Sequence, residues 1–297
     1  MGRKRTKRNA YKRGMKMYYQ LLQKHIRKQK TMLCFGLDPD IEKIPKKIEG
    51  SIKQRIVEFY CSIIDNAPKN SIAALKPNYA FFAQYGFEGI FALKEIIDCY
   101  KEKYLIILDA KRGDIENTSK AYVKEVFEFF RADATTLWPF MGFDSIKPFL
   151  DKCKENECGA YFLARTTNPS AEDFLLKKIE NVPLYLYNIE KILEWKEYAP
   201  ESVGAVVGAT APDDLKMVLE KIKENKIALL IPGIGTQGGD AFKIKQLLVE
   251  YDMEQFSLVN ASSQISWAYL KTGQDYLEAA IEQIRFLSNI LKIEGKI

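Results

Sequence analysis

The chain has 297 residues, of which 47% are hydrophobic, so it can bury a sizeable core as one large domain or as two ordinary ones. No apolar run reaches the roughly 18 residues that a membrane-spanning helix needs, and no segment resembles a secretory signal. Five cysteines without a C-x-x-C pair are typical of a reducing compartment and argue against a zinc site or a disulfide framework. The single histidine, His25, leaves Lys, Asp, Thr and backbone groups to do any chemistry. We therefore expect a cytoplasmic protein with no membrane segment and no zinc or histidine-based metal site.

The net charge of +6 comes from the N-terminal segment rather than from the whole chain. Residues 1–30 hold twelve Lys and Arg and no acid, which leaves 33 of the 45 basic residues against 39 acidic ones in the rest. We expect residues 1–14 to be a disordered basic extension and residues 15–297 to form one domain. A nucleic-acid contact or a targeting segment would also use basic residues. We favour a solvated tail, because targeting segments are usually rich in Ser and this one has none.

The first predicted element is a helix, because apolar residues recur at helical spacing from Met15 to Ile26. Short apolar stretches then predict eight strands, at residues 32–37, 72–75, 104–108, 134–137, 160–163, 203–207, 227–231 and 256–259. Amphipathic stretches between them predict helices, for example at residues 51–66, 88–102, 118–130 and 212–224.

This alternation predicts an α/β fold. Short, continuously apolar strands separated by helices are typical of a parallel sheet that is covered on both faces. Eight such units in about 265 residues fit a closed (β/α)8 barrel, the TIM barrel, better than an open doubly wound sheet. We expect a single TIM-barrel domain with an extra N-terminal helix, and such barrels keep their chemistry at the C-terminal ends of the strands.

The third predicted strand runs directly into the sequence LDAKRGDIENT at residues 108–118. Side chains two apart on a strand share a face, so Asp109 and Lys111 point the same way before Arg112 and Gly113 break the strand. Asp114 is then free to turn back or to reach a neighbouring subunit. Charges of both signs this close are costly unless they are paired, and a salt bridge at a strand end is one explanation. We favour a catalytic lysine between acids, because the motif sits where an apolar strand ends.

Other predicted strands also end in chemically useful side chains. The first leads to Asp38, the second to Lys76 and Asn78, and the fifth to Thr167. Any one of these could be an ordinary turn residue. Their joint appearance at successive strand ends indicates a site.

The last two strands lead to segments suited to a phosphate. The seventh is followed by PGIGTQGG, which contains Gly233, Gly235 and Gln237, and the eighth by NASS, which ends at Ser263. Barrels commonly hold a phosphate in these loops through backbone N–H groups, so we expect a phosphorylated substrate. The G-x-G is not a dinucleotide fingerprint, since it lacks a third glycine and an acid placed for a ribose.

Together these segments resemble orotidine 5'-phosphate decarboxylase, and most closely the longer, second-type branch of that family. The resemblance rests on LCFGLDPD (33–40), LKPNYAFF (75–82), LDAKRGDI (108–115), TTNP (166–169) and PGIGTQ (232–237). It covers nearly the whole chain after residue 14. The D-x-K-x-x-D element is shared with a wider group of barrel decarboxylases and aldolases, whereas the complete set is specific.

The resemblance implies a homodimeric, metal-free and cofactor-free enzyme that converts orotidine 5'-phosphate to UMP in de novo pyrimidine synthesis. Lys111 would protonate C6 of the pyrimidine. Lys76, Asp109 and an Asp114 supplied by the partner chain would complete a set of alternating charges around that carbon.

The resemblance also implies how the nucleoside would be held. Asp38 and Lys76 would bind ribose hydroxyls, and Thr118 would reach the ribose from the partner chain. Asn78 would steady either the lysine network or the ribose.

At the other end of the substrate, Thr167 would contact the pyrimidine, and Gln237 and the loop of Gly233 and Gly235 would contact the phosphate. One position departs from the family pattern, which usually has an arginine where this chain has Ser263. Serine offers a single neutral donor in place of a bidentate cation. Either Gln237 and the loop amides suffice, or a nearby Lys or Arg takes the role, or phosphate binding is weak.

Two other functions stay open. A Mg2+-dependent sugar-phosphate lyase or synthase of the same barrel group would need an acid where this chain has Lys76. A barrel without activity could act as a binding protein through its basic N-terminus, but the complete set of charged residues argues against it. Nucleic acid is not the partner that we expect.

Overall fold

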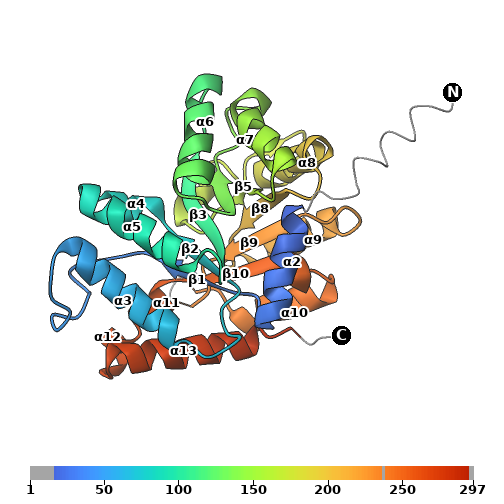
Figure 1. The fold of residues 1–297 in the computed structure, drawn as a ribbon. Helices are drawn as coiled ribbons and strands as arrows, with labels where there is room; N and C mark the ends of the chain where they lie inside the picture. Colours follow the sequence, from blue (N-terminus) through green and yellow to red (C-terminus); the bar gives the residue numbers. More distant parts are fainter. Residues whose placement is uncertain (1–16, 236–237, 294–297) are drawn as a thin grey trace.

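In the computed structural model, which describes residues 17–235 and 238–293, eight parallel strands close into a barrel (Figure 1). Around the barrel the strands follow the order β1, β10, β9, β8, β5, β4, β3, β2. Their bounds are Leu33–Leu37 (β1), Ala74–Pro77 (β2), Leu105–Arg112 (β3), Ala134–Leu137 (β4), Gly159–Arg165 (β5), Val203–Val207 (β8), Ala228–Pro232 (β9) and Ser257–Ala261 (β10). All eight coincide with predicted strands to within a few residues, and the expected TIM barrel is confirmed.

Helices cover the outside of the barrel (Figure 1). The longer ones are α3 (Ile52–Asn66), α5 (Gly86–Tyr100), α6 (Glu116–Val123), α7 (Phe143–Glu155), α8 (Leu184–Tyr198), α9 (Pro212–Ile222), α10 (Ala241–Glu250) and α13 (Tyr276–Ile290). Short helical segments are α4 (Tyr79–Ala83), the π-helix η1 (Lys124–Phe129), the 3-10 helices η2 (Pro169–Asp173) and η3 (Glu254–Phe256), α11 (Ser263–Ser266) and α12 (Tyr269–Thr272). No helix in the described part of the chain is long and apolar enough to cross a membrane.

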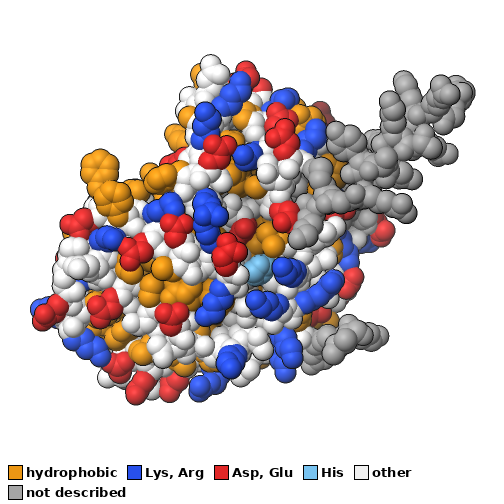
Figure 2. Space-filling model, in the orientation of Figure 1, with side chains coloured by type: hydrophobic (Ala, Val, Ile, Leu, Met, Phe, Trp, Pro, Cys, Tyr) orange, Lys and Arg blue, Asp and Glu red, His pale blue; other side chains and the backbone are white. Residues whose placement is uncertain are grey.

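The expected extra helix is present as α2 (Tyr18–Gln29), which packs across the N-terminal end of the barrel. Tyr18 is buried and donates its hydroxyl hydrogen to Tyr161 of β5 at 2.9 Å, and Tyr19 donates to the carbonyl of Val203 at 2.6 Å. The opposite face of α2 is basic, and Lys and Arg side chains lie beside His25 on the surface (Figure 2). The extension expected at residues 1–14 lies outside the described residues.

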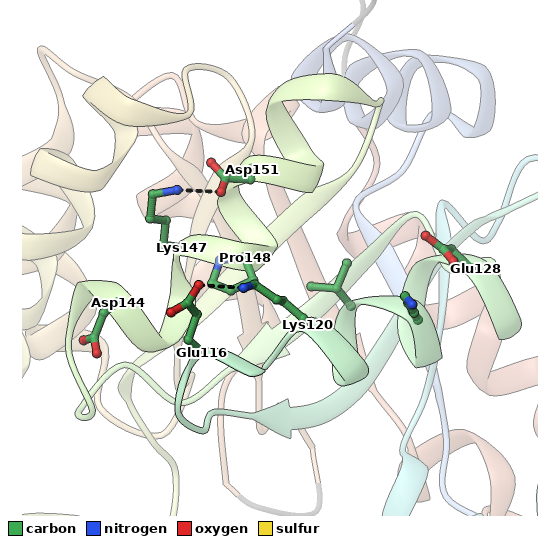
Figure 3. Close-up of a pocket in the computed structure, with 9 residues that line it drawn as sticks. Glu116, Lys120, Glu128, Asp144, Lys147, Pro148 and Asp151 are labelled. Carbon is green, nitrogen blue, oxygen red and sulfur yellow. Dashed lines mark hydrogen bonds and ion pairs between the residues drawn. The ribbon is translucent and has the colours of Figure 1, made fainter. Parts of the chain in front are cut away.

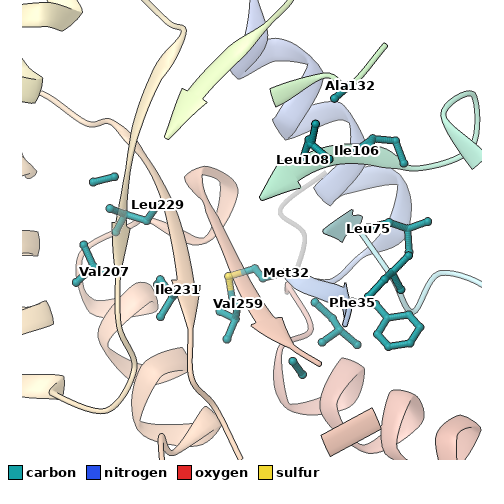
Figure 4. Packing of buried hydrophobic residues seen from close by; sticks show 14 of the residues in the cluster. Met32, Phe35, Leu75, Ile106, Leu108, Ala132, Val207, Leu229, Ile231 and Val259 are labelled. Carbon is teal, nitrogen blue, oxygen red and sulfur yellow. The ribbon is translucent and has the colours of Figure 1, made fainter. Parts of the chain in front are cut away.

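Strand side chains alternate between two apolar clusters. On β3, Ile106 and Leu108 pack outward in the cluster that Figure 4 shows with Phe35 and Leu75. Leu105 and Ile107 point inward, into a second cluster that includes Tyr18 of α2. This period of two, set by the pleat of the strand, fills the N-terminal half of the barrel with apolar side chains.

Three details differ from the sequence-based expectation. The third strand does not break at Arg112 but includes it, with a register shift against β4 between Leu108 and Arg112. The helix expected at residues 118–130 begins at Glu116 and ends as the π-helix η1. A small antiparallel pair, β6 (Lys178–Ile179) and β7 (Val182–Pro183), was not predicted, because two-residue strands leave no periodic pattern to read.

Candidate active site

The inward-facing positions of the barrel change from apolar to polar at the C-terminal ends of the strands. Four strands each have a buried polar residue two positions after an inward apolar one. These residues are Lys76 on β2, Asp109 on β3, Thr136 on β4 and Asn260 on β10. They line a cavity of about 230 Å³ at this end of the barrel. This polar cavity therefore lies at the end of the barrel where TIM barrels commonly have their sites.

Asp109 is the centre of the polar network in this cavity. Its Oδ2 accepts a hydrogen bond from Nζ of Lys76 at 2.8 Å, and its Oδ1 accepts from Nζ of Lys111 at 2.7 Å. Oδ1 also accepts from the hydroxyl of Thr136 at 2.8 Å. The side chains of Lys76 and Asp109 are 5% and 10% exposed, whereas that of Lys111 is 48% exposed. Asp109 is therefore paired with both lysines, and Lys111 is the member whose side chain is the more exposed.

The electrostatics of this network keep its buried members charged. Burial works to raise the pKa of Asp109, but the ammonium groups of Lys76 and Lys111 outweigh it and hold that pKa well below its usual range. Burial likewise works to lower the pKa of Lys76, but the carboxylates of Asp109 and Asp38 raise it above its ordinary value. Both groups are therefore ionised at neutral pH.

Lys111 reaches Asp109 through an unusual backbone. Its φ is +48°, in the left-handed region that a lysine rarely adopts. Its N–H bonds the hydroxyl of Thr136 at 3.0 Å instead of a strand carbonyl. Thr136 thus holds both the backbone of Lys111 and the carboxylate of Asp109. The sequence reading did not single out Thr136, although its place two residues after the inward Ala134 marks it as facing the cavity.

Two buried acceptors in the cavity have no hydrogen-bond partner among the described residues, Oδ1 of Asp38 and Oδ1 of Asn260. An unsatisfied buried carboxylate or amide oxygen is costly, and a ligand hydroxyl or N–H would relieve that cost. Gly36 of β1 allows the strands to approach here, because a Cβ at this position would lie 1.9 Å from Oγ of Ser262 and 2.9 Å from Oδ1 of Asn260.

The structure brings most of the predicted substrate-binding residues to this cavity. Those that line it are Asp38, Asn78, Thr167, Gly233 and Ser263. The wall also includes apolar side chains that the sequence reading did not assign, namely Leu163, Val206, Leu230 and Pro232.

The phosphate end predicted after β9 and β10 is uncharged in the described part of the chain. Gly233 and Gly235 have φ of +97° and +77°, and the N–H of Gly235 bonds the carbonyl of Gly239 at 3.0 Å. Gly235 does not line the cavity. Gln237 lies outside the described residues. Among the described lining residues, the cations are Lys76 on β2 and Lys111 on β3.

Asp114 and Thr118 do not line the cavity of their own chain. Oδ1 of Asp114 accepts the N–H of Ile115 at 2.7 Å, and Thr118 lies on α6. In a single chain these two residues are therefore separated from the network that Asp109 organises.

Two other hollows lie nearby on the surface. One, of about 550 Å³, lies between α6, η1 and α7, where Lys120 pairs with Glu116 and Lys147 with Asp151 (Figure 3). None of the predicted site residues lines it. The other, here called the Trp138 groove, has about 700 Å³, adjoins Lys111, and is lined mainly by apolar side chains that include Trp138, Phe140 and Phe174.

Comparison with known proteins agrees with this geometry. Residues 31–271 match the sequence profile of the orotidine 5'-phosphate decarboxylase / HUMPS family. The chain is 36% identical over 268 residues to orotidine 5'-phosphate decarboxylase of Variovorax paradoxus, covering 88% of this chain and 93% of that protein. It is 34% identical to the protein of that name from Herpetosiphon aurantiacus, with coverage of 89% and 94%.

Solved structures give the same result. The OMP decarboxylase of Leishmania donovani superposes with a TM-score of 0.74 at 29% identity, covering 93% of this chain and 99% of that one. The UMP synthase of the same organism superposes with a TM-score of 0.76 at 30% identity, covering 92% of this chain and 56% of that longer one. This chain belongs to the orotidine 5'-phosphate decarboxylase / HUMPS family.

Proposed function

We propose that this protein decarboxylates orotidine 5'-phosphate to UMP without a cofactor, and that Lys111 donates the proton. The observation that carries the proposal is the Lys76–Asp109–Lys111 network, in which one ammonium remains half-exposed toward the cavity. The names of the relatives supply the substrate. The reaction belongs to de novo pyrimidine synthesis, and we place it in the cytoplasm.

The reaction needs a group that stabilises negative charge on carbon. When the bond between C6 and the carboxylate breaks, CO2 leaves and the electron pair remains on C6. A fixed ammonium at that carbon stabilises the developing charge and then transfers a proton to C6, which forms UMP. Lys111 then recovers a proton from water, to which its side chain is accessible.

The flanking charges prepare Lys111 for this step. Asp109 lies 2.7 Å from its Nζ and holds the ammonium in place through a charge-assisted hydrogen bond. Lys76 holds the other oxygen of Asp109, so the carboxylate cannot rotate away. Asp109 would also repel the substrate carboxylate, and this repulsion is relieved when CO2 leaves.

The cavity offers matching contacts for the rest of the nucleotide. The unsatisfied oxygen of Asp38 suits a ribose hydroxyl, with Lys76 as a second contact and Asn78 beside them. Thr167 would contact the pyrimidine. The phosphate would lie at Gly233 and Ser263, with Gly235 and Gln237 completing the loop.

The active species would be a homodimer in which Asp114 and Thr118 complete the site of the partner chain. Both lie outside their own cavity, although Asp114 belongs to the same motif as Lys111. Large apolar side chains are exposed nearby, with Ile115 at 64% and Trp138 at 43%, and burial against a second copy would remove them from water.

The second candidate is a Mg2+-dependent sugar-phosphate lyase or synthase, since the family description extends beyond the decarboxylases. The donor set argues against it. The carboxylates among the described cavity residues are Asp38 and Asp109, and both oxygens of Asp109 are engaged by lysines. No cluster of three or more metal-binding side chains occurs in the described ranges.

The test is an ultraviolet assay for loss of orotidine 5'-phosphate, run with and without EDTA. The proposal predicts turnover to UMP at the same rate in both. Activity that EDTA abolishes and Mg2+ restores would favour the second candidate. No turnover of orotidine 5'-phosphate by folded protein would overturn the proposal.

A further inference from the structure

The backbone that presents Lys111 is a bulge in β3. Leu108 pairs with Thr135 and Arg112 with Leu137, so four residue steps on β3 oppose two on β4. The extra residues fall on the segment that carries Asp109 and Lys111, and Lys111 takes the left-handed φ of +48°. A non-glycine residue adopts this region only at a cost in free energy, so its surroundings must enforce it.

One side of the bulge is held by β4. The hydroxyl of Thr135 donates to the carbonyl of Leu108 at 2.8 Å, and Thr136 bonds the N–H of Lys111. The strand ladder resumes at Arg112, whose carbonyl accepts the N–H of Trp138 at 2.8 Å.

The other side is held by the side chain of Arg112. Its Nε and Nη2 bond the two oxygens of Glu125 at 2.9 and 2.7 Å. Its guanidinium carbon lies 4.4 Å from the ring centre of Tyr79 and 4.6 Å from that of Tyr122. We call these four residues the Arg112 clamp. Glu125 belongs to the π-helix η1, and π-helical turns are rare and often mark functional sites.

The clamp also joins β3 to β2. Tyr79 begins α4, directly after Asn78, which pairs with Asp109 in an isolated bridge. The two strand ends that carry Lys76 and Lys111 are therefore attached to the same guanidinium. Arginine suits this place, because its planar fork binds the carboxylate with two bonds while the guanidinium also contacts the rings of Tyr79 and Tyr122.

Arg112 does not line the cavity, and Glu125 balances its charge. Its side chain therefore does not contact a substrate bound in its own chain, so any effect that it has on catalysis there acts through the backbone of β3. We propose that Arg112 is a positioning residue that holds Lys111 in its left-handed conformation, so that its ammonium stays aimed at the reacting carbon. This inference rests on the proposed role of Lys111 as proton donor.

The test compares four variants in the full chain, assayed well below their melting temperatures. Arg112→Lys keeps the charge but loses the fork and the stacking, and Tyr122→Leu removes one ring. Tyr122→Phe keeps the ring face. Tyr19→Leu removes a buried tyrosine at the opposite end of the barrel and serves as the control for lost stability.

We expect Arg112→Lys to lower kcat about tenfold to a hundredfold while KM changes less than about threefold, since misplacing a catalytic group by 1 Å costs about a hundredfold. Tyr122→Leu should lower kcat by a smaller factor, and Tyr122→Phe, which keeps the ring, should have a kcat close to the native value. Tyr19→Leu should lower the melting temperature and leave kcat unchanged. Native kcat in both Arg112→Lys and Tyr122→Leu, or an equal fall in Tyr19→Leu, would overturn the proposal.

A crystal structure of Arg112→Lys separates this proposal from the one for Lys111. The clamp predicts that Lys111 leaves its left-handed conformation and that the 2.7 Å contact with Asp109 is lost. An unchanged Lys111 would refute the clamp even if Lys111→Ala is inactive. A displaced Lys111 would support the clamp even if Lys111→Ala retains activity, in which case the proton-donor role would be the part that fails.

Discussion

Replacing Ser263 by arginine would test whether the phosphate end of the cavity lacks a cation. Ser263 lines the cavity at the start of α11, and the cations among the described lining residues are Lys76 on β2 and Lys111 on β3. Its carbonyl accepts the N–H of Trp267 at 3.0 Å, a backbone bond that the substitution preserves. The new side chain is expected to extend into the cavity that Ser263 lines.

The expected gain follows from the strength of a charge-assisted hydrogen bond, about 1.5–3 kcal/mol. At about 1.4 kcal/mol per decade this is roughly a tenfold to hundredfold rise in kcat/KM for orotidine 5'-phosphate. Part of the phosphate interaction is realised only in the transition state, so KM alone does not account for the gain.

Steady-state kinetics on two substrates and two variants measure this effect. Ser263→Arg should raise kcat/KM for orotidine 5'-phosphate and leave the rate with orotidine, which has no phosphate, nearly unchanged. Ser263→Gln adds length without charge and should give little of the gain. If Ser263→Arg leaves turnover of the phosphorylated substrate unchanged, another group already binds the phosphate and the reasoning is wrong.

Three further results are expected. Mixing inactive Lys111→Ala and Asp114→Ala chains should restore activity once subunits exchange, because each heterodimer then has one site with both native residues; no recovery would mean that each barrel has its own complete site. Thr136→Val should lower the free energy of unfolding, measured in urea, by about 1–3 kcal/mol, because it leaves the N–H of Lys111 without its acceptor. Its kcat should also fall, and a native kcat would contradict the role of Thr136 in holding Lys111. Burial raises the pKa of Asp133 from 3.8 to about 7, so the stability that this group contributes below pH 3.8 is lost as pH rises through about 7. Asp133→Asn keeps an acceptor for the N–H of Ile106, and in urea unfolding its stability relative to the native chain should increase by about 1–3 kcal/mol between pH 5 and pH 8. A difference that does not change with pH would contradict the shift.

Much of the barrel could be predicted from the sequence, because its strands are short apolar runs that leave a clear pattern. Site candidates such as Asp38, Lys76 and Asp109 could also be located, because polar residues at the ends of the apolar strands all fall at one end of a parallel barrel. The same period of two places Thr136, two residues after the inward Ala134, on the face that lines the cavity.

The bulge at Lys111 could not be predicted. Its left-handed backbone depends on contacts with residues distant in sequence, Thr136 on β4 and the side chains around Arg112. The π-helix that places Glu125 has no periodicity of its own to distinguish it from a continuing α-helix. The sequence-based reading took Arg112 as the point where the strand breaks, whereas it is the residue at which pairing with β4 resumes.

The central claim is that Lys111 stabilises the carbanion and protonates it, and turnover by Lys111→Ala tests it most directly. The variant should keep the native melting temperature to within a few degrees, because Lys111 is half-exposed and Asp109 keeps its bond to Lys76. Its kcat should fall by at least about 10⁴-fold, since an oriented charge contributes about 10²–10³ and a positioned general acid about 10²–10⁴. Turnover within about tenfold of the native rate, in protein of matched thermal stability, would contradict the account.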